Sequence, residues 1–119
     1  MASHRIEQVN ELIRSELAQI ILRELEFPIG CLVTLTKVAT ASDLKTAKVF
    51  FSVLPTSYLD KAMKVLHKNH GRLQGFLGSR LKMQFVPRME FKIDLSLEKA
   101  AHINELLEKI ENEKKMNNP

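Results

Sequence analysis

The sequence predicts a single-domain α+β protein in which helices cover one face of a three-stranded sheet. Apolar residues recur at three- and four-residue intervals near residues 6–25, 59–81 and 97–110, as in amphipathic helices. They alternate with polar residues at 47–53 and 82–94, as in strands with one buried face. The predicted order is helix, strand, strand, helix, kink, helix, strand, helix. No repeat or long linker divides the 119 residues, so one core is expected.

The first predicted element is a long amphipathic helix over residues 6–25. Ser3 is its candidate N-cap, because a serine hydroxyl can accept a hydrogen bond from a free amide of the first turn. The helix is expected to stop at Phe27-Pro28, which Gly30 follows.

A β-hairpin is predicted next. Residues 32–39 are rich in Val, Thr and Leu, residues 40–43 form a polar turn, and a second strand covers 47–53. The residues expected on the buried face of that strand are Ala47, Val49, Phe51 and Val53. Phe50 breaks the polarity of the opposite face.

Two helices joined by a kink should follow. Ser57-Tyr58-Leu59-Asp60 has the form of a capping box that opens the first of them. Asn69-His70-Gly71 interrupts the apolar stripe, and the glycine predicts a bend because it reaches backbone angles that other residues avoid. Gly75 and Gly78 lower the helix propensity of the second helix, which is therefore expected to be short.

The last predicted elements are a strand and a helix. The alternation over 82–94 places Met83 and Phe85 on the buried face, and Pro87 requires an edge position or a bulge. Ser96 is the candidate N-cap of the final helix. The domain is expected to span residues 1–110, and the polar segment 111–119 is expected to fray.

Composition points to an intracellular protein with a moderate preference for polyanions. Lys and Arg number 18 against 14 acidic residues, a net charge of +4. Cys31 is the single cysteine, so no internal disulfide can form, and a small buried thiol is expected. The N-terminus has no apolar signal core, and no apolar run approaches the roughly 20 residues of a membrane span. We expect a soluble, cytoplasmic protein.

Catalytic and metal-binding patterns are weak. Gly75-Phe76-Leu77-Gly78 spells GxxG, but its apolar middle residues favour core packing over a phosphate-binding loop. His67 and His70 share a helical spacing without a nearby carboxylate or cysteine, which favours solvated side chains. Cys31 has no local partner that would activate it as a nucleophile. We therefore predict no enzyme activity, no metal, no cofactor and no small-molecule substrate.

Basic residues are the better candidates for function. The predicted RNA-binding set is Arg5, Lys45, Lys48, Arg72, Arg80, Lys82 and Arg88. Arg72, beside the kink, is placed to meet a phosphate near a helix N-terminus. Aromatic residues are few, so contacts to the RNA backbone should dominate over base stacking.

Several runs of residues resemble the ribosome-binding factor A family, in the order and spacing of that family. They are the helix 5–22, the hairpin runs 33–38 and 42–49, and the runs 77–82, 87–91 and 94–98. Agreement of separate motifs over about residues 5–110 is much more specific than one short pattern.

The resemblance implies a type II KH-like fold and a role in ribosome biogenesis. Family members bind the free, immature small (30S) subunit through its 16S ribosomal RNA, act late in its maturation and matter most in the cold. An Ala-x-Gly kink replaces the usual GxxG loop in the family, and here Asn69-His70-Gly71 occupies that position. A monomer that contacts no membrane is expected. The alternative is a protein-interaction module that recruits a partner through a strand edge or the terminal helix.

Overall fold

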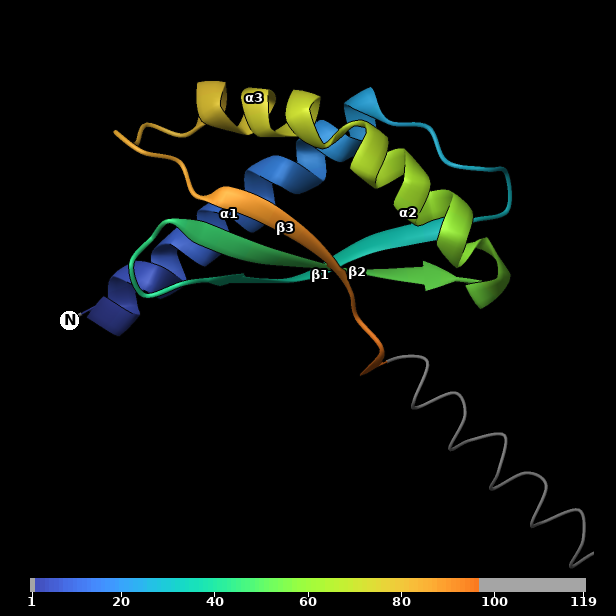
Figure 1. Cartoon of the computed structure of the whole chain (residues 1–119), viewed down its shortest axis with the longest axis horizontal. Helices are drawn as coiled ribbons and strands as arrows, with labels where there is room; N and C mark the ends of the chain where they lie inside the picture. The colour runs from blue at the N-terminus through green and yellow to red at the C-terminus, as the bar shows by residue number, and fades with distance from the viewer. Residues whose placement is uncertain (1, 97–119) are drawn as a thin grey trace, which may run out of the picture.

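A mixed three-stranded sheet carries three helices on one face in the computed structural model, which describes residues 2–96 (Figure 1). The elements are α1 (Ala2–Glu24), β1 (Leu32–Thr40), β2 (Thr46–Leu54), α2 (Leu59–Lys68), α3 (His70–Arg80) and β3 (Arg88–Ile93). The predicted α+β class and element order are thus confirmed as far as β3. The predicted final helix, apart from Ser96, and the tail 111–119 lie outside the described residues.

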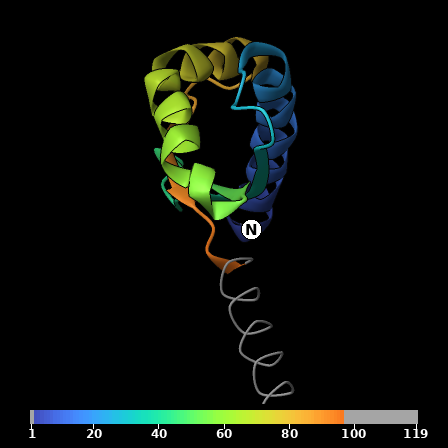
Figure 2. The same cartoon turned by 90° about the vertical axis from the view of Figure 1, so that its right-hand side faces the viewer.

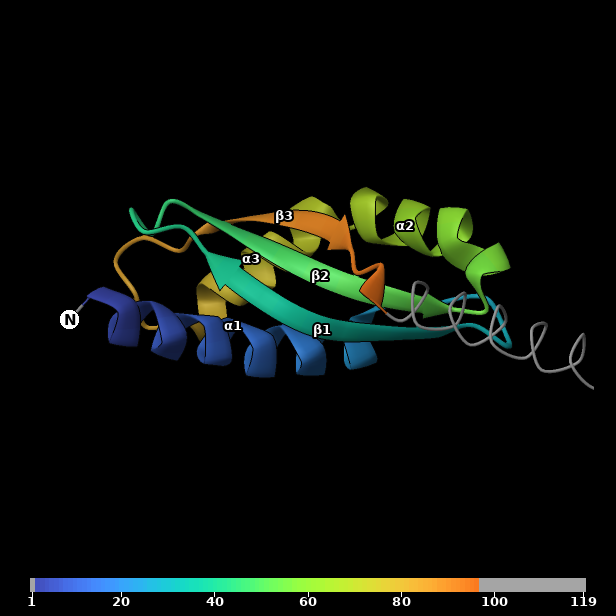
Figure 3. The ribbon, with the colours of Figure 1, turned by 90° about the horizontal axis from the view of Figure 1, so that it is seen from below.

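The central strand of the sheet is β2. It pairs antiparallel with β1 and parallel with β3, so β3 is an edge strand. The edge position predicted from Pro87 is confirmed by this strand order, although Pro87 lies just before β3 and not within it. Seen from below, the sheet lies in front of α2 and α3 (Figure 3), so the helices are gathered on its far side.

The hydrophobic core lies between the sheet and the helices. The buried face predicted for β2 is confirmed, since Ala47, Val49 and Phe51 are fully buried and Val53 nearly so. The Phe51 ring meets the Phe91 ring of β3 edge-on, with ring centroids 5.4 Å apart. In the end-on view of Figure 2, α1 and α2 lie on opposite sides with α3 at the top. The apolar faces of the three helices pack against the sheet.

Both predicted helix starts are wrong in detail. Helix α1 already begins at Ala2, so Ser3 lies inside the helix and is not its N-cap. Helix α2 begins at Leu59, after a 3-10 turn over Thr56–Tyr58, and no side chain caps it. The predicted capping box therefore does not form, because Ser57 is part of that preceding turn.

The bend between α2 and α3 occurs where it was predicted but not for the predicted reason. Asn69 is the non-helical residue between the two helices, and Gly71 lies inside α3 without a left-handed backbone angle. The Asn69 side chain donates a hydrogen bond of 2.8 Å to the carbonyl oxygen of Val65, which satisfies an acceptor at the end of α2. The break in the helix thus falls at Asn69, and Gly71 does not use the backbone freedom for which the bend was assigned to it.

Strand β3 is shorter than predicted. It covers Arg88–Ile93, whereas the alternation of the sequence had extended it back to residue 82. The register explains the difference: Arg88 pairs with Thr46, the first residue of β2, so residues 82–87 have no strand to pair with. The expected burial of Phe85 is therefore wrong, since its side chain is 77% exposed.

Side chains of α3 cover the outer edge of β3. The Gln74 carboxamide donates to the Pro87 carbonyl (3.0 Å) and accepts from the Met89 amide (2.8 Å). The His70 ring nitrogen Nε2 lies 2.7 Å from the Met89 carbonyl oxygen. His70 is consequently half-buried, and the prediction of a solvated histidine is wrong here, although His67 is exposed as expected.

A carboxylate fixes the end of β3. Asp94 accepts hydrogen bonds from the Thr36 hydroxyl (2.7 Å) and the Ser96 amide (2.9 Å). Bonds from Ser96 and then Thr36 to the charged form lower the pKa of Asp94 from 3.8 to about 2. Asp94 thereby joins β3 to β1 across the central strand.

This lowered pKa predicts a pH-dependent stability. A carboxyl group with a depressed folded-state pKa stabilises the fold above its unfolded value of 3.8, and this contribution is lost as the pH falls toward 2. The thermal midpoint of the wild-type chain should therefore fall more steeply than that of Asp94→Asn between about pH 5 and pH 2. Parallel melting curves across this range would argue against the Thr36–Asp94–Ser96 contact.

Candidate RNA interface

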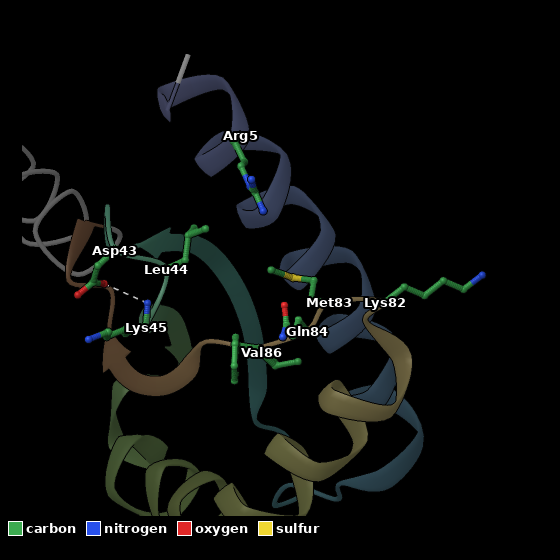
Figure 4. A pocket seen from close by; sticks show the side chains of 9 residues that line it. Arg5, Asp43, Leu44, Lys45, Lys82, Met83, Gln84 and Val86 are labelled. Carbon is green, nitrogen blue, oxygen red and sulfur yellow. Dashed lines mark hydrogen bonds between the residues drawn. The ribbon is translucent and has the colours of Figure 1, made fainter.

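A groove of about 670 Å³ opens at one end of the molecule (Figure 4). The start of α1, the turn between β1 and β2 and the segment between α3 and β3 form its walls. Its lining residues are Arg5, Asp43, Leu44, Lys45, Lys82, Met83, Gln84, Phe85 and Val86. Three residues of the predicted RNA-binding set, which are far apart in the sequence, are thus brought together: Arg5, Lys45 and Lys82.

The hairpin turn on one side of the groove is held by its own hydrogen bonds. The Leu44 amide donates to the Ala41 carbonyl (2.9 Å), and the Lys45 amide donates to the Asp43 carboxylate (3.0 Å). The Lys45 carbonyl accepts from the Arg88 amide (2.9 Å), which joins the turn to β3. Leu44 has a φ of 61°, a left-handed conformation that costs energy for a branched side chain. The backbone of Lys45 is therefore fixed on both sides.

Helix α1 is tied to the same hairpin. The side-chain oxygen of Asn10 accepts a hydrogen bond of 2.8 Å from the Thr40 amide at the end of β1. This bond holds the first turns of α1 beside the turn, and Arg5 lies on one of those turns. The helix that carries Arg5 and the hairpin that carries Lys45 are thus joined by a side-chain to backbone hydrogen bond.

The three cations of the groove differ in direction. In Figure 4 the guanidinium of Arg5 points from α1 toward the space between the walls, while Lys45 and Lys82 point outward on opposite sides. None of the three forms an ion pair with an acidic residue within residues 2–96. The Asp43 carboxylate, which also lines the groove, accepts a hydrogen bond from the backbone amide of Lys45 and forms no ion pair with these cations. Their positive charges are therefore available to an anionic ligand.

Lys48 and Arg88 lie on the sheet face that turns away from the helices. Lys48 is exposed between the buried residues Ala47 and Val49, and Arg88 is 71% exposed and 3.7 Å from the Glu90 carboxylate. Strand β2 begins directly after the hairpin turn, and the first residue of β3, Arg88, bonds that turn at Lys45. Lys48 and Arg88 therefore lie next to the wall of the groove that contains Lys45.

The same sheet face carries two lysines that the predicted set lacks. Lys37 and Lys92 stand in register with Phe50 on the strands to either side, and the Lys37 ammonium lies 5.7 Å from the centre of the Phe50 ring. Strand alternation identifies Lys92 as a residue of the polar face. Lys37 reaches that face through the register shift between Leu35 and Lys37, which alternation does not reveal.

Arg72 and Arg80 have partners on α1 instead. The Arg72 guanidinium donates to the backbone carbonyl of Glu24 (2.7 Å), the last residue of α1, and lies 3.8 Å from its carboxylate. Arg80 lies 3.2 Å from the Glu16 carboxylate, with both side chains largely covered. These two contacts join α3 to α1. Asn69-His70-Gly71 begins α3 at the end opposite the groove.

The described residues contain little that suggests other chemistry. Gly75 and Gly78 lie within α3, and Leu77 between them is fully buried, which confirms the interpretation as core packing. Cys31 is half-buried rather than buried as expected, because it lies where the chain enters β1. Within residues 2–96 no three His, Cys, Asp or Glu side chains are grouped so that they could hold a metal ion.

None of the helices in residues 2–96 combines the length and the apolar character that crossing a bilayer requires.

Comparison of sequences identifies close relatives. The family described as ribosome-binding factor A matches residues 5–107. A ribosome-binding factor A of Bdellovibrio bacteriovorus is 33% identical over 97% of this chain and 87% of its own length. That of Halothermothrix orenii is 38% identical over 95% of this chain and 93% of its own length.

Comparison of structures supports the fold. The crystal structure of ribosome-binding factor A from Thermus thermophilus matches 74% of this chain and 94% of its own, with a TM-score of 0.64 and 22% identity. A homology model of the Thermus thermophilus protein, fitted into a cryo-EM map of a 30S complex, matches with a TM-score of 0.60 and 25% identity over 72% of this chain and 91% of its own. The type II KH-like fold expected from the sequence agrees with these structures. This chain belongs to the ribosome-binding factor A family.

Proposed function

We propose that this protein binds the free small ribosomal subunit through its 16S ribosomal RNA and assists the late maturation of that subunit. The observation that carries the proposal is that Arg5, Lys45 and Lys82 line one groove, without acidic partners in residues 2–96. Cations without acidic partners favour RNA, because on contact with its phosphates they release counterions. The Thermus thermophilus neighbour fitted into a 30S complex supports this choice of partner.

The rest of the predicted set fits around this centre. Lys48 and Arg88 extend the basic surface onto the open sheet face, where Lys37 and Lys92 add to it. Arg72 and Arg80 already contact α1, so a phosphate would have to share their guanidinium groups. We therefore rank them below the groove residues as RNA contacts.

The proposed activity is binding without a chemical step. A factor that binds an immature particle more tightly than the mature one shifts the subunit population and is released when maturation removes its site. This requires only surface complementarity and no cofactor. The hydrogen bonds that fix the turn at Lys45 reduce the conformational entropy that binding would cost.

The cellular part of the proposal concerns rRNA processing and growth in the cold. Deletion of the gene from its host should slow growth at low temperature and cause precursor 16S rRNA to accumulate. A copy encoding the intact chain should restore both, whereas Arg5→Ala/Lys45→Ala/Lys82→Ala should not. Normal 16S processing in the deletion strain at low temperature would contradict the proposal.

A matched control for this experiment removes the same charge elsewhere. Arg23, Lys61 and Lys64 are exposed on α1 and α2 and do not line the groove. The variant Arg23→Ala/Lys61→Ala/Lys64→Ala should rescue growth and processing as the intact gene does.

A further inference from the structure

Phe85 is the one exposed residue among the phenylalanines and the tyrosine of this protein. All six phenylalanines and the single tyrosine fall within residues 2–96, and the others are buried or half-buried. Phe85 is 77% exposed and lines the groove that contains Arg5, Lys45 and Lys82. An aromatic ring exposed among cations is the combination that single-stranded RNA sites use.

The local structure explains how the ring is held there. Residues 82–87 have no strand to pair with, and both ends of the segment are anchored: Leu81 is 4% exposed and Pro87 is buried. The Arg88 amide then bonds the Lys45 carbonyl across the groove wall. Phe85 therefore lies in a short segment whose two ends are buried, and its ring is exposed to solvent instead of packing in the core.

We propose that this groove binds one unpaired RNA nucleotide, whose base stacks on Phe85 while the cations contact the phosphates. The inference rests on the proposed RNA-binding function and specifies the ligand of its central site. A groove of about 670 Å³ falls within the usual size of sites for small organic groups. The exposed Gln84 carboxamide in the lining can donate to or accept from a base edge.

The directions of the cations agree with a strand that crosses the groove. Arg5 points into the space beside the nucleotide, and Lys45 and Lys82 point outward on opposite sides (Figure 4). The phosphates before and after the bound nucleotide would meet these two lysines. A duplex cannot use the site in this way, because its bases are stacked on one another and their faces are covered.

The test compares three RNA probes by fluorescence anisotropy at low salt: a short single-stranded oligouridine, the same strand with abasic riboses, and a duplex of equal length. The intact chain should bind the oligouridine about 5- to 100-fold more tightly than the abasic strand, the range that stacking of one base provides. Phe85→Ala should bind the oligouridine no more tightly than the abasic strand, and its affinity for the abasic strand should equal that of the intact chain. Phe85→Tyr should keep the ratio, because it keeps the aromatic face.

Ile29→Ala is the matched control, because Ile29 is a 98% exposed apolar residue outside the groove. It should leave all three affinities unchanged. The inference is overturned if Phe85→Ala still binds the oligouridine more tightly than the abasic strand by the same factor. It is also overturned if the substitution weakens the binding of both strands equally. If the intact chain binds the three probes with steep salt dependence but without preference for bases, this inference fails and the proposed function stands. If it binds no RNA at low salt, both fail.

Discussion

Phe51→Ala is expected to lower the free energy of unfolding by about 3–5 kcal/mol, the typical cost of removing a buried phenylalanine. Phe51 is fully buried on the central strand, and its ring packs edge-on against Phe91. The substitution therefore leaves a cavity between the sheet and the helices. Domains of this size are stabilised by only about 5–15 kcal/mol, so the variant should lose a large part of its stability.

Urea denaturation followed by circular dichroism measures this effect. Phe85→Ala removes the same ring from an exposed position and should change the free energy of unfolding by less than about 0.5 kcal/mol. Equal losses in the two variants would mean that Phe51 does not occupy the centre of the core, or that Phe85 is packed.

Arg5→Ala/Lys45→Ala/Lys82→Ala is expected to weaken binding to the small ribosomal subunit about 10- to 100-fold at low salt, through the loss of phosphate contacts. The three side chains surround one groove and have no acidic partner within residues 2–96. The slope of log affinity against log salt should become shallower by about 2, at roughly 0.7 per lost contact.

Affinity measured over a salt series separates this effect from general weakening. The control Arg23→Ala/Lys61→Ala/Lys64→Ala has the same net charge and should retain most of the affinity of the intact chain. Similar losses in both variants would indicate that overall charge, not the groove, determines binding.

The regular elements were predictable because their patterns are long and local. The stripe of α1 and the alternation of Ala47, Val49, Phe51 and Val53 each report one buried face. Burial of these faces requires the sheet and the helices to pack in two layers, so the fold class follows from the pattern.

The errors arose where local pattern and tertiary context disagree. Residues 82–87 alternate like a strand, but β2 begins only at Thr46, opposite Arg88, and offers them no partner. The non-helical residue of the bend is Asn69, whose side chain bonds Val65, whereas the pattern had pointed to Gly71. For residues 82–87 the deciding factor is therefore another part of the chain, the start of β2.

The sequence identified the residues of the candidate site but not which of them lie together in the folded chain. Arg5, Lys45 and Lys82 belong to three segments that only the tertiary structure brings together, in part through the Asn10–Thr40 and Arg88–Lys45 contacts. Acidic partners are also invisible in the sequence, since Glu16 and Glu24 lie more than 40 residues from Arg80 and Arg72. Phe85 was missed because its alternation predicted burial.

Co-sedimentation of the intact chain with purified small subunits, large subunits and whole ribosomes across a salt series tests the central claim most directly. We predict binding to free small subunits, with affinity that falls steeply as salt rises and with little binding to the other two particles. Absence of binding to small subunits at low salt would contradict it. Binding that does not respond to salt would also contradict it, and would favour a protein contact through a strand edge.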